Sequence, residues 1–368
     1  MDYSKLVNGG LARLKPYQAG KPIEEVQREL GLSDVIKLAS NENPLGMSPK
    51  AIAAAQQAVV NCHYYPDANG YYLKQALSDK FGYDPACLTL GDGSNELINL
   101  IFQCFANPQV NVVLPELSFI VYPMEATVAA AEIRTIPLKD YFIDTKALLE
   151  AIDDKTRLVV LANPSNPAGT ALDYDTLKDF VSKVPESTLV VIDEAYNEYQ
   201  TTAYVDTAKW IEEFPNLLVC RTFSKAYGLA GFRIGYMVSN AQIAALINTL
   251  RAPFNVNAVA QAAAIAALND SEHLHKVVQV NNAERERYAA YCKQQGLKMI
   301  PSSANFVAVD FARDAQPIYQ YLLEHGVIVR PVKGYGLDTI LRISIGTPEQ
   351  NDKLFALLTQ YLQENPLK

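Results

Sequence analysis

The chain has 368 residues, of which 49% are hydrophobic and 20% are charged, a balance typical of an ordinary soluble globular protein and not of a disordered or fibrous one. This length is enough for two packed domains with a sizeable core. The net charge of −8 argues against nucleic acid as the main partner, because a phosphate backbone needs a basic stripe and none is visible.

The first 40 residues show no strand and helix pattern of their own, and we expect them to pack against the C-terminal part. Beyond them, helical patterns lie at residues 49–60, 72–81, 95–105 and 174–182. Strand patterns lie at residues 110–114, 133–136, 158–162, 189–192, 218–221 and 235–238. Because these strands are hydrophobic almost throughout, they predict an α/β fold with a mainly parallel sheet covered on both faces.

The pattern changes after about residue 250. Two helical stretches are followed by a long charged helix near residues 271–296, then by short strands at 305–309, 327–330 and 341–345 and a helix at 316–325. This α+β arrangement predicts a second, smaller domain. We therefore divide the chain into a large domain, residues 41–255, and a small domain formed by residues 1–40 with 256–368.

Cysteine usage and the apolar segments indicate where the protein resides. The five cysteines are odd in number and never spaced C-x-x-C, so reduced thiols are expected. The N-terminus has no apolar stretch of the signal-peptide kind, and the most apolar helical stretch, residues 257–268, is too short to span a bilayer. We expect a soluble, cytoplasmic protein with no membrane partner.

Several common site motifs are absent or incomplete. The segment that starts Gly91-Asp-Gly93 resembles a dinucleotide fingerprint, but Glu96 stands where a third glycine is needed. There is no Walker A loop and no G-x-S-x-G elbow. The four histidines form no ligand set, since His273 and His275 would point to different faces of a helix. We expect no metal site.

Two turns carry polar groups that can bind a ligand. Ser94 and Asn95 follow a glycine turn that opens a helix, where free N–H groups and the helix dipole bind phosphate. An ordinary helix N-cap explains the same residues. Asn166 lies in a turn after a predicted strand, fixed by two prolines and a glycine, which can aim its amide outward; an ordinary turn is the alternative.

Two further segments follow buried strands. Asp193 ends one strand and Tyr196 follows three residues later; the carboxylate can pair with a cationic ring nitrogen or cap the next helix. The other segment holds Thr222, Ser224, Lys225 and Arg233 among glycines. A lysine at a strand end becomes a nucleophile when burial or nearby cations lower its pKa, and hydroxyls with an arginine bind phosphate.

Together these segments offer a phosphate cradle, an acid for a ring nitrogen, an amide and a phenol for a ring oxygen, and a reactive lysine. Pyridoxal phosphate carries the matching groups, namely a phosphate, a pyridine nitrogen, a phenolic oxygen and an aldehyde. The combination therefore indicates a pyridoxal-phosphate enzyme.

The order of these motifs resembles the fold-type-I aminotransferases, and specifically the histidinol-phosphate aminotransferase family. The resemblance extends over essentially the whole chain and includes the segments that end at Tyr17, Gly46, Glu96 and Thr347. It implies a mainly parallel seven-stranded sheet in the large domain and a small α+β domain. It also implies a homodimer with a shared active site.

The resemblance assigns roles to individual residues. It implies that Lys225 is the catalytic lysine that carries the cofactor and that Asp193 pairs with the pyridinium nitrogen. It places Asn166 and Tyr196 on the phenolic oxygen. Around the phosphate it places Ser94, Asn95, Thr222, Ser224 and Arg233. Phe119 stands where the family has a stacking aromatic, often tyrosine, so a hydrogen bond from that position is lost.

The resemblance also places Arg330 and Arg342, with Tyr17 and with Tyr65 from a second subunit, around the phosphate of the substrate. Two guanidinium groups suit a dianionic phosphate and also accept the carboxylate of an α-keto acid or glutamate. The alternative is that one of these two arginines is a salt-bridged residue on the strand surface.

The implied reaction is transamination between L-histidinol phosphate and 2-oxoglutarate in histidine biosynthesis. An aromatic amino-acid aminotransferase would share every cofactor residue, and the 21 tyrosines make an aromatic pocket easy to imagine. A threonine-phosphate decarboxylase and a non-catalytic binding protein on the same scaffold are the remaining alternatives.

Overall fold

The computed structural model describes residues 3–366 apart from 4–5, 8–9, 15–19 and 201–204. Its helices are α1 Ile23–Leu30, α2 Pro49–Val59, α3 Tyr71–Phe81, α4 Gly93–Phe105, α5 Val121–Val128, α6 Thr145–Glu150, α7 Tyr174–Lys183, α8 Ala241–Leu250, α9 Ala258–Leu268, α10 Ser271–Gln294, α11 Gln316–Glu324 and α12 Pro348–Glu364. Its strands are β1 Ile36–Lys37, β2 Leu88–Gly91, β3 Asn111–Pro115, β4 Glu132–Ile136, β5 Thr156–Ala162, β6 Leu189–Asp193, β7 Leu217–Thr222, β8 Gly235–Ser239, β9 Lys298–Ile300, β10 Phe306–Asp310, β11 Val327–Ile328, β12 Arg330–Val332 and β13 Leu337–Ser344.

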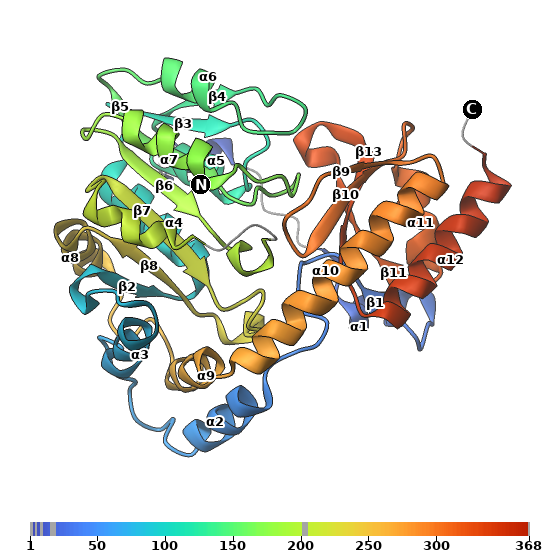
Figure 1. Cartoon of the computed structure of the whole chain (residues 1–368), viewed down its shortest axis with the longest axis horizontal. Coiled ribbons are helices and arrows are strands. Elements are labelled where there is room, and N and C mark those ends of the chain that lie inside the picture. Colours follow the sequence, from blue (N-terminus) through green and yellow to red (C-terminus); the bar gives the residue numbers. More distant parts are fainter. Residues whose placement is uncertain (1–2, 4–5, 8–9, 15–19, 201–204, 367–368) are drawn as a thin grey trace.

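A seven-stranded sheet dominates the first two thirds of the chain (Figure 1). Its strand order is β2-β8-β7-β6-β5-β3-β4, with β8 antiparallel to both neighbours and the other pairs parallel. The predicted α/β class and mainly parallel sheet are therefore confirmed. Strand β2 was not predicted, because its last residue, Gly91, belongs to the glycine turn that precedes α4.

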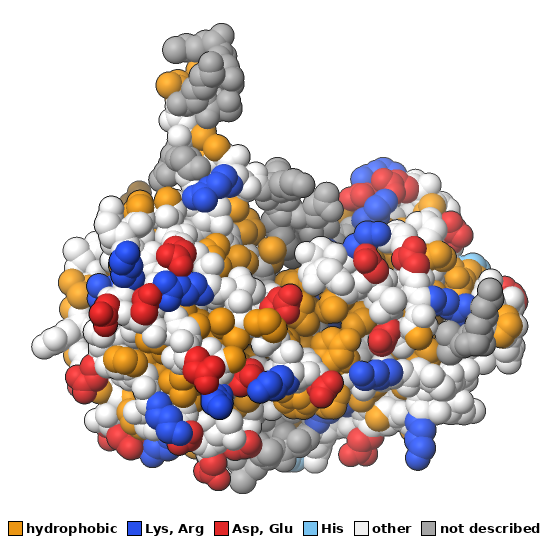
Figure 2. All heavy atoms as spheres, turned by 90° about the horizontal axis from the view of Figure 1, so that it is seen from above, with side chains coloured by type: hydrophobic (Ala, Val, Ile, Leu, Met, Phe, Trp, Pro, Cys, Tyr) orange, Lys and Arg blue, Asp and Glu red, His pale blue; other side chains and the backbone are white. Residues whose placement is uncertain are grey.

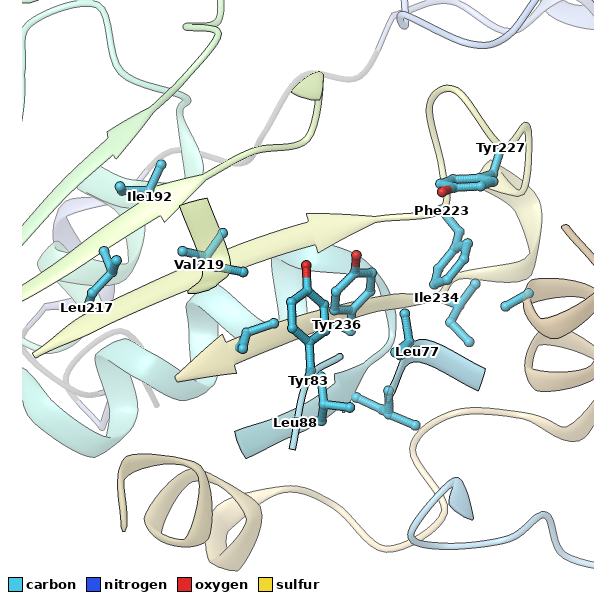
Figure 3. Close-up of a cluster of buried hydrophobic side chains, with 14 of the residues drawn as sticks. Leu77, Tyr83, Leu88, Ile192, Leu217, Val219, Phe223, Tyr227, Ile234 and Tyr236 are labelled. Atoms are coloured by element: carbon cyan, nitrogen blue, oxygen red, sulfur yellow. The ribbon is translucent and has the colours of Figure 1, made fainter. Parts of the chain in front are cut away.

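Helices cover both faces of this sheet, and successive strand residues alternate between the two resulting cores. Val113 of β3 packs in the core beneath α2, α3, α7 and α9, whereas its neighbours Val112 and Leu114 pack against α4 and α5. Figure 3 shows part of the first core, where Ile192 and Val219 share a buried cluster with other strand and helix side chains. Burial on both faces explains why these strands are hydrophobic almost throughout.

The C-terminal part forms a second, antiparallel sheet of order β12-β13-β10-β9. Helices α10, α11 and α12 contribute to its core. Figure 1 shows them beside this sheet, in orange and red. The strand predicted at 327–330 is in fact two short strands, since β11 pairs outside this sheet and β12 within it. Helices α5, α6 and α12 have no counterpart among the predicted elements.

The N-terminal segment joins this C-terminal part. Strand β1 pairs in parallel with β11, and Leu38 N–H donates to the carbonyl oxygen of Ile328. The expectation that the first 40 residues lack elements of their own is wrong, because α1 and β1 form there. Gly31, in the left-handed region at φ 68°, ends α1.

The division into residues 41–255 and residues 1–40 with 256–368 stays a prediction. Helix α9 lies beyond its boundary, yet it packs against α2 and its alanines share a buried cluster with the seven-stranded sheet. We therefore propose that the large unit extends to Leu268.

The surface carries mixed charge. On the face shown in Figure 2, basic and acidic side chains are interspersed over the described residues. No helix in the described part of the chain is long and apolar enough to cross a membrane.

Candidate active site

The carboxyl ends of the parallel strands β5, β6 and β7 meet at one edge of the large sheet, where polar side chains surround a cavity of about 280 Å³. Twelve of the predicted site residues line it: Ser94, Asn95, Phe119, Asn166, Asp193, Tyr196, Thr222, Ser224, Lys225, Arg233, Arg330 and Arg342. These twelve residues lie as much as 248 positions apart along the chain and share one cavity.

Lys225 lies three residues beyond the end of β7 and is partly buried. Its Nζ donates to the carbonyl oxygen of Ser40 at 3.2 Å. Burial lowers the pKa of Lys225 to about 8, and the positive charge of Arg342 acts in the same direction. An amine with this pKa is partly neutral at physiological pH and can act as a nucleophile or a base.

Asp193 is the last residue of β6 and is only 4% exposed. The phenol of Tyr122 donates to its Oδ2 at 2.7 Å, and the N–H of Ala195 donates to its Oδ1 at 3.1 Å. Burial raises the pKa of Asp193 to about 6, while both hydrogen bonds and the positive charge of Lys225 oppose that shift. A positively charged ring nitrogen beside this carboxylate would stabilise its charged form.

Tyr196 and Asn166 form a second polar group on the wall of the cavity. The amide Nδ2 atoms of Asn166 and Asn41 donate to Tyr196 Oη at 3.1 and 3.0 Å. Because both partners donate, the phenol's own proton is left for an acceptor in the cavity. Burial raises the pKa of Tyr196 to about 12, so the phenol keeps that proton at neutral pH.

The first turn of α4 lies at the cavity together with the end of β7 and Arg233. Ser94 and Asn95 lie on that turn, and Thr222 and Ser224 face the same cavity. Gly93 has φ 73°, and a Cβ there would stand 2.7 Å from Nη2 of Arg233. The helix start, two hydroxyls and a guanidinium together suit a phosphate.

Two carboxylates hold this turn in place. Asp92 pairs with Arg233, with Oδ1 and Nε 3.3 Å apart. Glu96 Oε2 accepts from the N–H of Asp92 at 2.5 Å and from Nδ2 of Asn255 at 2.6 Å. Glu96, which breaks the dinucleotide fingerprint, thus fixes this turn by two hydrogen bonds.

Arg330 and Arg342 stand directly opposite each other in the antiparallel pair β12 and β13. Arg342 donates to Oδ1 of Asn166 at 2.7 Å and to the carbonyl oxygen of Ala39 at 2.7 Å. Like charges opposite each other destabilise a sheet, so an anion bound between the two guanidinium groups would offset their repulsion.

The predicted residues Tyr65 and Phe119 differ in their position relative to the cavity. Tyr17 lies outside the described residues. Tyr65 is 82% exposed, does not line the cavity and stacks on Phe254 with ring centroids 4.7 Å apart. Phe119 lines the cavity, and its ring meets the Tyr122 ring edge-on with the centroids 5.8 Å apart.

Sequence reasoning missed Asn41 and Tyr122, both of which line the cavity and are buried. Asn41 lies inside a segment that carries the family resemblance, and Tyr122 lies three residues after Phe119. Their contacts with Tyr196 and Asp193, however, join residues 155 and 71 positions apart. In the described residues, no group of three or more His, Cys, Asp and Glu side chains could hold a metal ion.

Comparison with known proteins identifies the family. Residues 33–358 match the family model of aminotransferase class I and II. Histidinol-phosphate aminotransferase 2 of Haemophilus influenzae (strain 86-028NP) is 47% identical over 99% of this chain and 100% of its own length. The enzyme of the same name from Pseudomonas aeruginosa is 46% identical over 98% of this chain and 99% of its own.

Solved structures agree with this result. Histidinol-phosphate aminotransferase from Sinorhizobium meliloti, in complex with pyridoxal-5'-phosphate, has a TM-score of 0.90 at 31% identity and covers 97% of this chain and 98% of its own. The aspartate aminotransferase of Thermus thermophilus shares the fold, with a TM-score of 0.80 at 21% identity and coverage of 95% of this chain and 100% of its own. The cavity lies at the same sheet edge that the motifs predicted, and the chain belongs to the class I and II aminotransferases, within them to the histidinol-phosphate aminotransferase family.

Proposed function

We propose that this protein is a cytoplasmic, pyridoxal-phosphate-dependent aminotransferase that acts on L-histidinol phosphate and 2-oxoglutarate in histidine biosynthesis. The observation that carries the proposal is the cross-strand pair of Arg330 and Arg342 on the wall of the cavity that holds Lys225. The names of relatives that are 46–47% identical along nearly their whole length support the same substrate.

The cavity fits pyridoxal phosphate group by group. The α4 turn, the two hydroxyls and Arg233 would hold its phosphate, where Gly93 leaves room that a Cβ would fill. Asp193, a buried carboxylate, would pair with the ring nitrogen. Tyr196 and Asn166 would contact the ring oxygen, and Phe119 offers a flat apolar face to the ring. Lys225 supplies the amine that the aldehyde needs.

When bound, pyridoxal phosphate supplies a ring that accepts the electrons left on a substrate carbon that has lost a proton. Lys225 would take that proton and return it, because its lowered pKa lets the neutral amine exist near neutral pH. Asp193 would keep a proton on the ring nitrogen. Arg330 and Arg342 would fix the anionic end of the substrate so that its reacting carbon faces Lys225.

The same two arginines serve both substrates. A dianionic phosphate accepts hydrogen bonds from two guanidinium groups, and the distal carboxylate of 2-oxoglutarate accepts fewer. Arg342 also donates to Asn166, which donates in turn to Tyr196, so the substrate end of the cavity is joined to the cofactor end by hydrogen bonds.

We further propose that two copies of the chain share their active sites. Large apolar side chains are exposed at the end of α2, along the segment that follows it, and in α3 and α8: Val59, Val60, Tyr64, Tyr65, Tyr71, Tyr72, Leu246 and Leu250. A surface of this kind suits a protein interface. Tyr65 lies within it, away from its own cavity, which fits a role in the cavity of a second copy.

The substrate panel that tests the function uses the pyridoxal-phosphate-loaded enzyme with L-histidinol phosphate, phenylalanine, tyrosine and aspartate, each with 2-oxoglutarate. We expect kcat/KM to be highest for histidinol phosphate. A higher value for phenylalanine would favour an aromatic aminotransferase. Carbon dioxide release from threonine phosphate without a keto acid would favour a decarboxylase, and a protein that binds no pyridoxal phosphate would refute the proposal.

A further inference from the structure

Tyr122 lies in the first turn of α5, and its side chain is fully buried. Its hydroxyl donates to Asp193 Oδ2, while the N–H of Ala195 donates to Oδ1. Each oxygen of the carboxylate therefore has one donor from the protein. Both donors act from fixed positions, one on a helix and one on the backbone that leaves β6.

The surroundings of Asp193 otherwise disfavour a charge. Burial is the largest influence on the pKa of Asp193 and raises it, and the neighbouring Glu194 adds to that rise. Lys225 acts in the opposite direction from across the cavity. The other titratable groups that face Asp193 are the thiol of Cys220 on the adjacent strand β7 and the phenol of Tyr196, both buried.

Tyr122 can donate its hydrogen bond to Asp193 throughout the neutral pH range. Burial and the adjacent Asp193 raise its pKa well above the usual value for a phenol, so it keeps its proton over the whole neutral range. The same ring meets Phe119 edge-on with centroids 5.8 Å apart. One side chain thus contacts both the carboxylate and the aromatic ring on which the cofactor would stack.

We propose that Tyr122 is a positioning residue that keeps the Asp193 carboxylate charged and aimed at the ring nitrogen of the cofactor. The inference rests on the proposed function, because the target of Asp193 is the pyridine ring of pyridoxal phosphate. Removal of the hydroxyl leaves a buried carboxylate with one donor fewer, and a hydrogen bond to a charged group contributes more than one between neutral groups.

The first test uses the cofactor-free protein, with wild type and Tyr122→Phe compared by carbon-13 NMR of labelled aspartate. Asp193→Asn identifies the signal of Asp193. We expect the titration midpoint of Asp193 to rise by at least one pH unit in Tyr122→Phe, which is a tenfold change in its protonation equilibrium. Tyr288→Phe is the matched control, because this buried phenol donates to Asn351 in the C-terminal part. In Tyr288→Phe, the titration midpoint of Asp193 should equal that of wild type.

The second test measures cofactor binding. Tyr122→Phe should bind pyridoxal phosphate roughly 10- to 100-fold more weakly than wild type, in line with the loss of a hydrogen bond to a charged group. For the 1-deaza analogue, in which carbon replaces the ring nitrogen, the two proteins should bind alike. Equal binding of both compounds to Tyr122→Phe and wild type, or an unchanged Asp193 midpoint, would overturn the inference.

Two further outcomes keep the test decisive. If wild type fails to bind pyridoxal phosphate, the proposed function itself is refuted. If Tyr122→Phe does not fold, replacement of Tyr122 by 3-fluorotyrosine, which keeps the ring and is a stronger donor, should lower the Asp193 midpoint; a midpoint that stays at the wild-type value would count against the role.

Discussion

Burial shifts the two central titratable groups of the site in opposite directions. It raises the pKa of Asp193 to about 6 and lowers the pKa of Lys225 to about 8. Both groups thereby titrate much closer to neutral pH than exposed aspartate or lysine does, as is common for groups that exchange or hold protons in catalysis. The cofactor-free site thus holds two groups whose charges the fold disfavours, the buried Asp193 and the partly buried Lys225, and a bound cofactor would relieve both.

Lys225→Ala should abolish both covalent attachment of pyridoxal phosphate and turnover, because no other amine lines the cavity in the described part of the chain. Attachment is measured by mass spectrometry after borohydride reduction, and turnover by glutamate formation. Lys146→Ala is the control, since the side chain of Lys146 is 83% exposed on α6. Normal turnover by Lys225→Ala would contradict the assigned role.

Asp193→Asn should stabilise the cofactor-free protein at alkaline pH. The folded-state pKa of Asp193 is raised from 3.8 to about 6, so its protonated form stabilises the fold below pH 4. That stabilisation is lost as the pH rises from 4 through 6. The asparagine side chain of the variant does not ionise. The free energy of unfolding of the variant, relative to that of wild type, should therefore be up to about 3 kcal/mol higher above pH 7 than at pH 4.

Urea unfolding of both proteins at pH 4 and pH 8 measures this difference. Lys225 and Tyr122 are present in both proteins. Because the charge of Asp193 raises the pKa of Lys225, the difference at pH 8 also includes the coupled titration of this lysine. A stability difference that does not vary with pH would show that Asp193 is equally charged in the folded and unfolded chain.

Local sequence patterns predicted the residues that follow buried strands. Asp193 and Lys225 were found because a polar side chain directly after a hydrophobic run lies at the sheet edge where ligands bind. Asn41 and Tyr122 could not be found in this way. Their partners lie far away in sequence, and nothing in the segments around them shows which phenol or carboxylate the folded chain brings near.

At the scale of elements, the start of α4 forms part of the proposed anion cradle. Gly93→Ala should weaken pyridoxal-phosphate binding by about tenfold or more, because the new Cβ would collide with Arg233 and strain a backbone with φ 73°. Fluorescence titration of the cofactor-free protein measures the affinity. Gly231→Ala is the control, since a Cβ at that position meets no atom within 4 Å; a similar loss in both variants would count against the cradle.

The strand pair β12 and β13 carries Arg342, whose loss should affect the use of substrate more than the binding of cofactor. Arg342→Ala should lower kcat/KM for histidinol phosphate by about 30-fold or more, because loss of one partner of a buried charge pair costs roughly 2–5 kcal/mol. Affinity for pyridoxal phosphate should change less. Arg287→Ala is the control, because the ion pairs of Arg287 with Glu284 and Asp352 lie outside the cavity. A change below threefold for Arg342→Ala would contradict the substrate role.

Hydrophobic strands covered on both faces were predictable, since burial on two sides gives a continuous apolar run. Strand β1 has two residues, too few to show a period, and β2 ends in the glycine turn before α4. Helix α12 begins at a complete capping box formed by Thr347 and Gln350, a local signal that could have been used. The opposition of Arg330 and Arg342 depends on β-pairing register, which short strands do not reveal on their own.

For the whole molecule, the cavity joins segments from both ends of the chain. Arg330 and Arg342 come from the C-terminal sheet, and Ala39 to Glu42 reach it from the N-terminal segment that pairs with β11. The large sheet supplies the residues proposed for the cofactor, and the small sheet those proposed for the anionic end of the substrate. A movement of one sheet relative to the other would therefore alter substrate contacts more than cofactor contacts.

Sharing of active sites between two copies can be tested by mixing inactive variants. Tyr65→Ala should reduce turnover at least tenfold if Tyr65 completes the cavity of its partner, although it lies 82% exposed in its own chain. When Tyr65→Ala is mixed with Lys225→Ala and the subunits exchange, one cavity of each mixed dimer combines an intact Lys225 with an intact Tyr65. An equal mixture should then recover about a quarter of wild-type activity, because half of the dimers are mixed and each has one complete cavity. Lys225→Ala mixed with Arg342→Ala is the matched control and should recover nothing, since both residues belong to the cavity of one chain. Recovery in neither mixture, with dimers and exchange verified by native mass spectrometry, would place Tyr65 outside the partner's site.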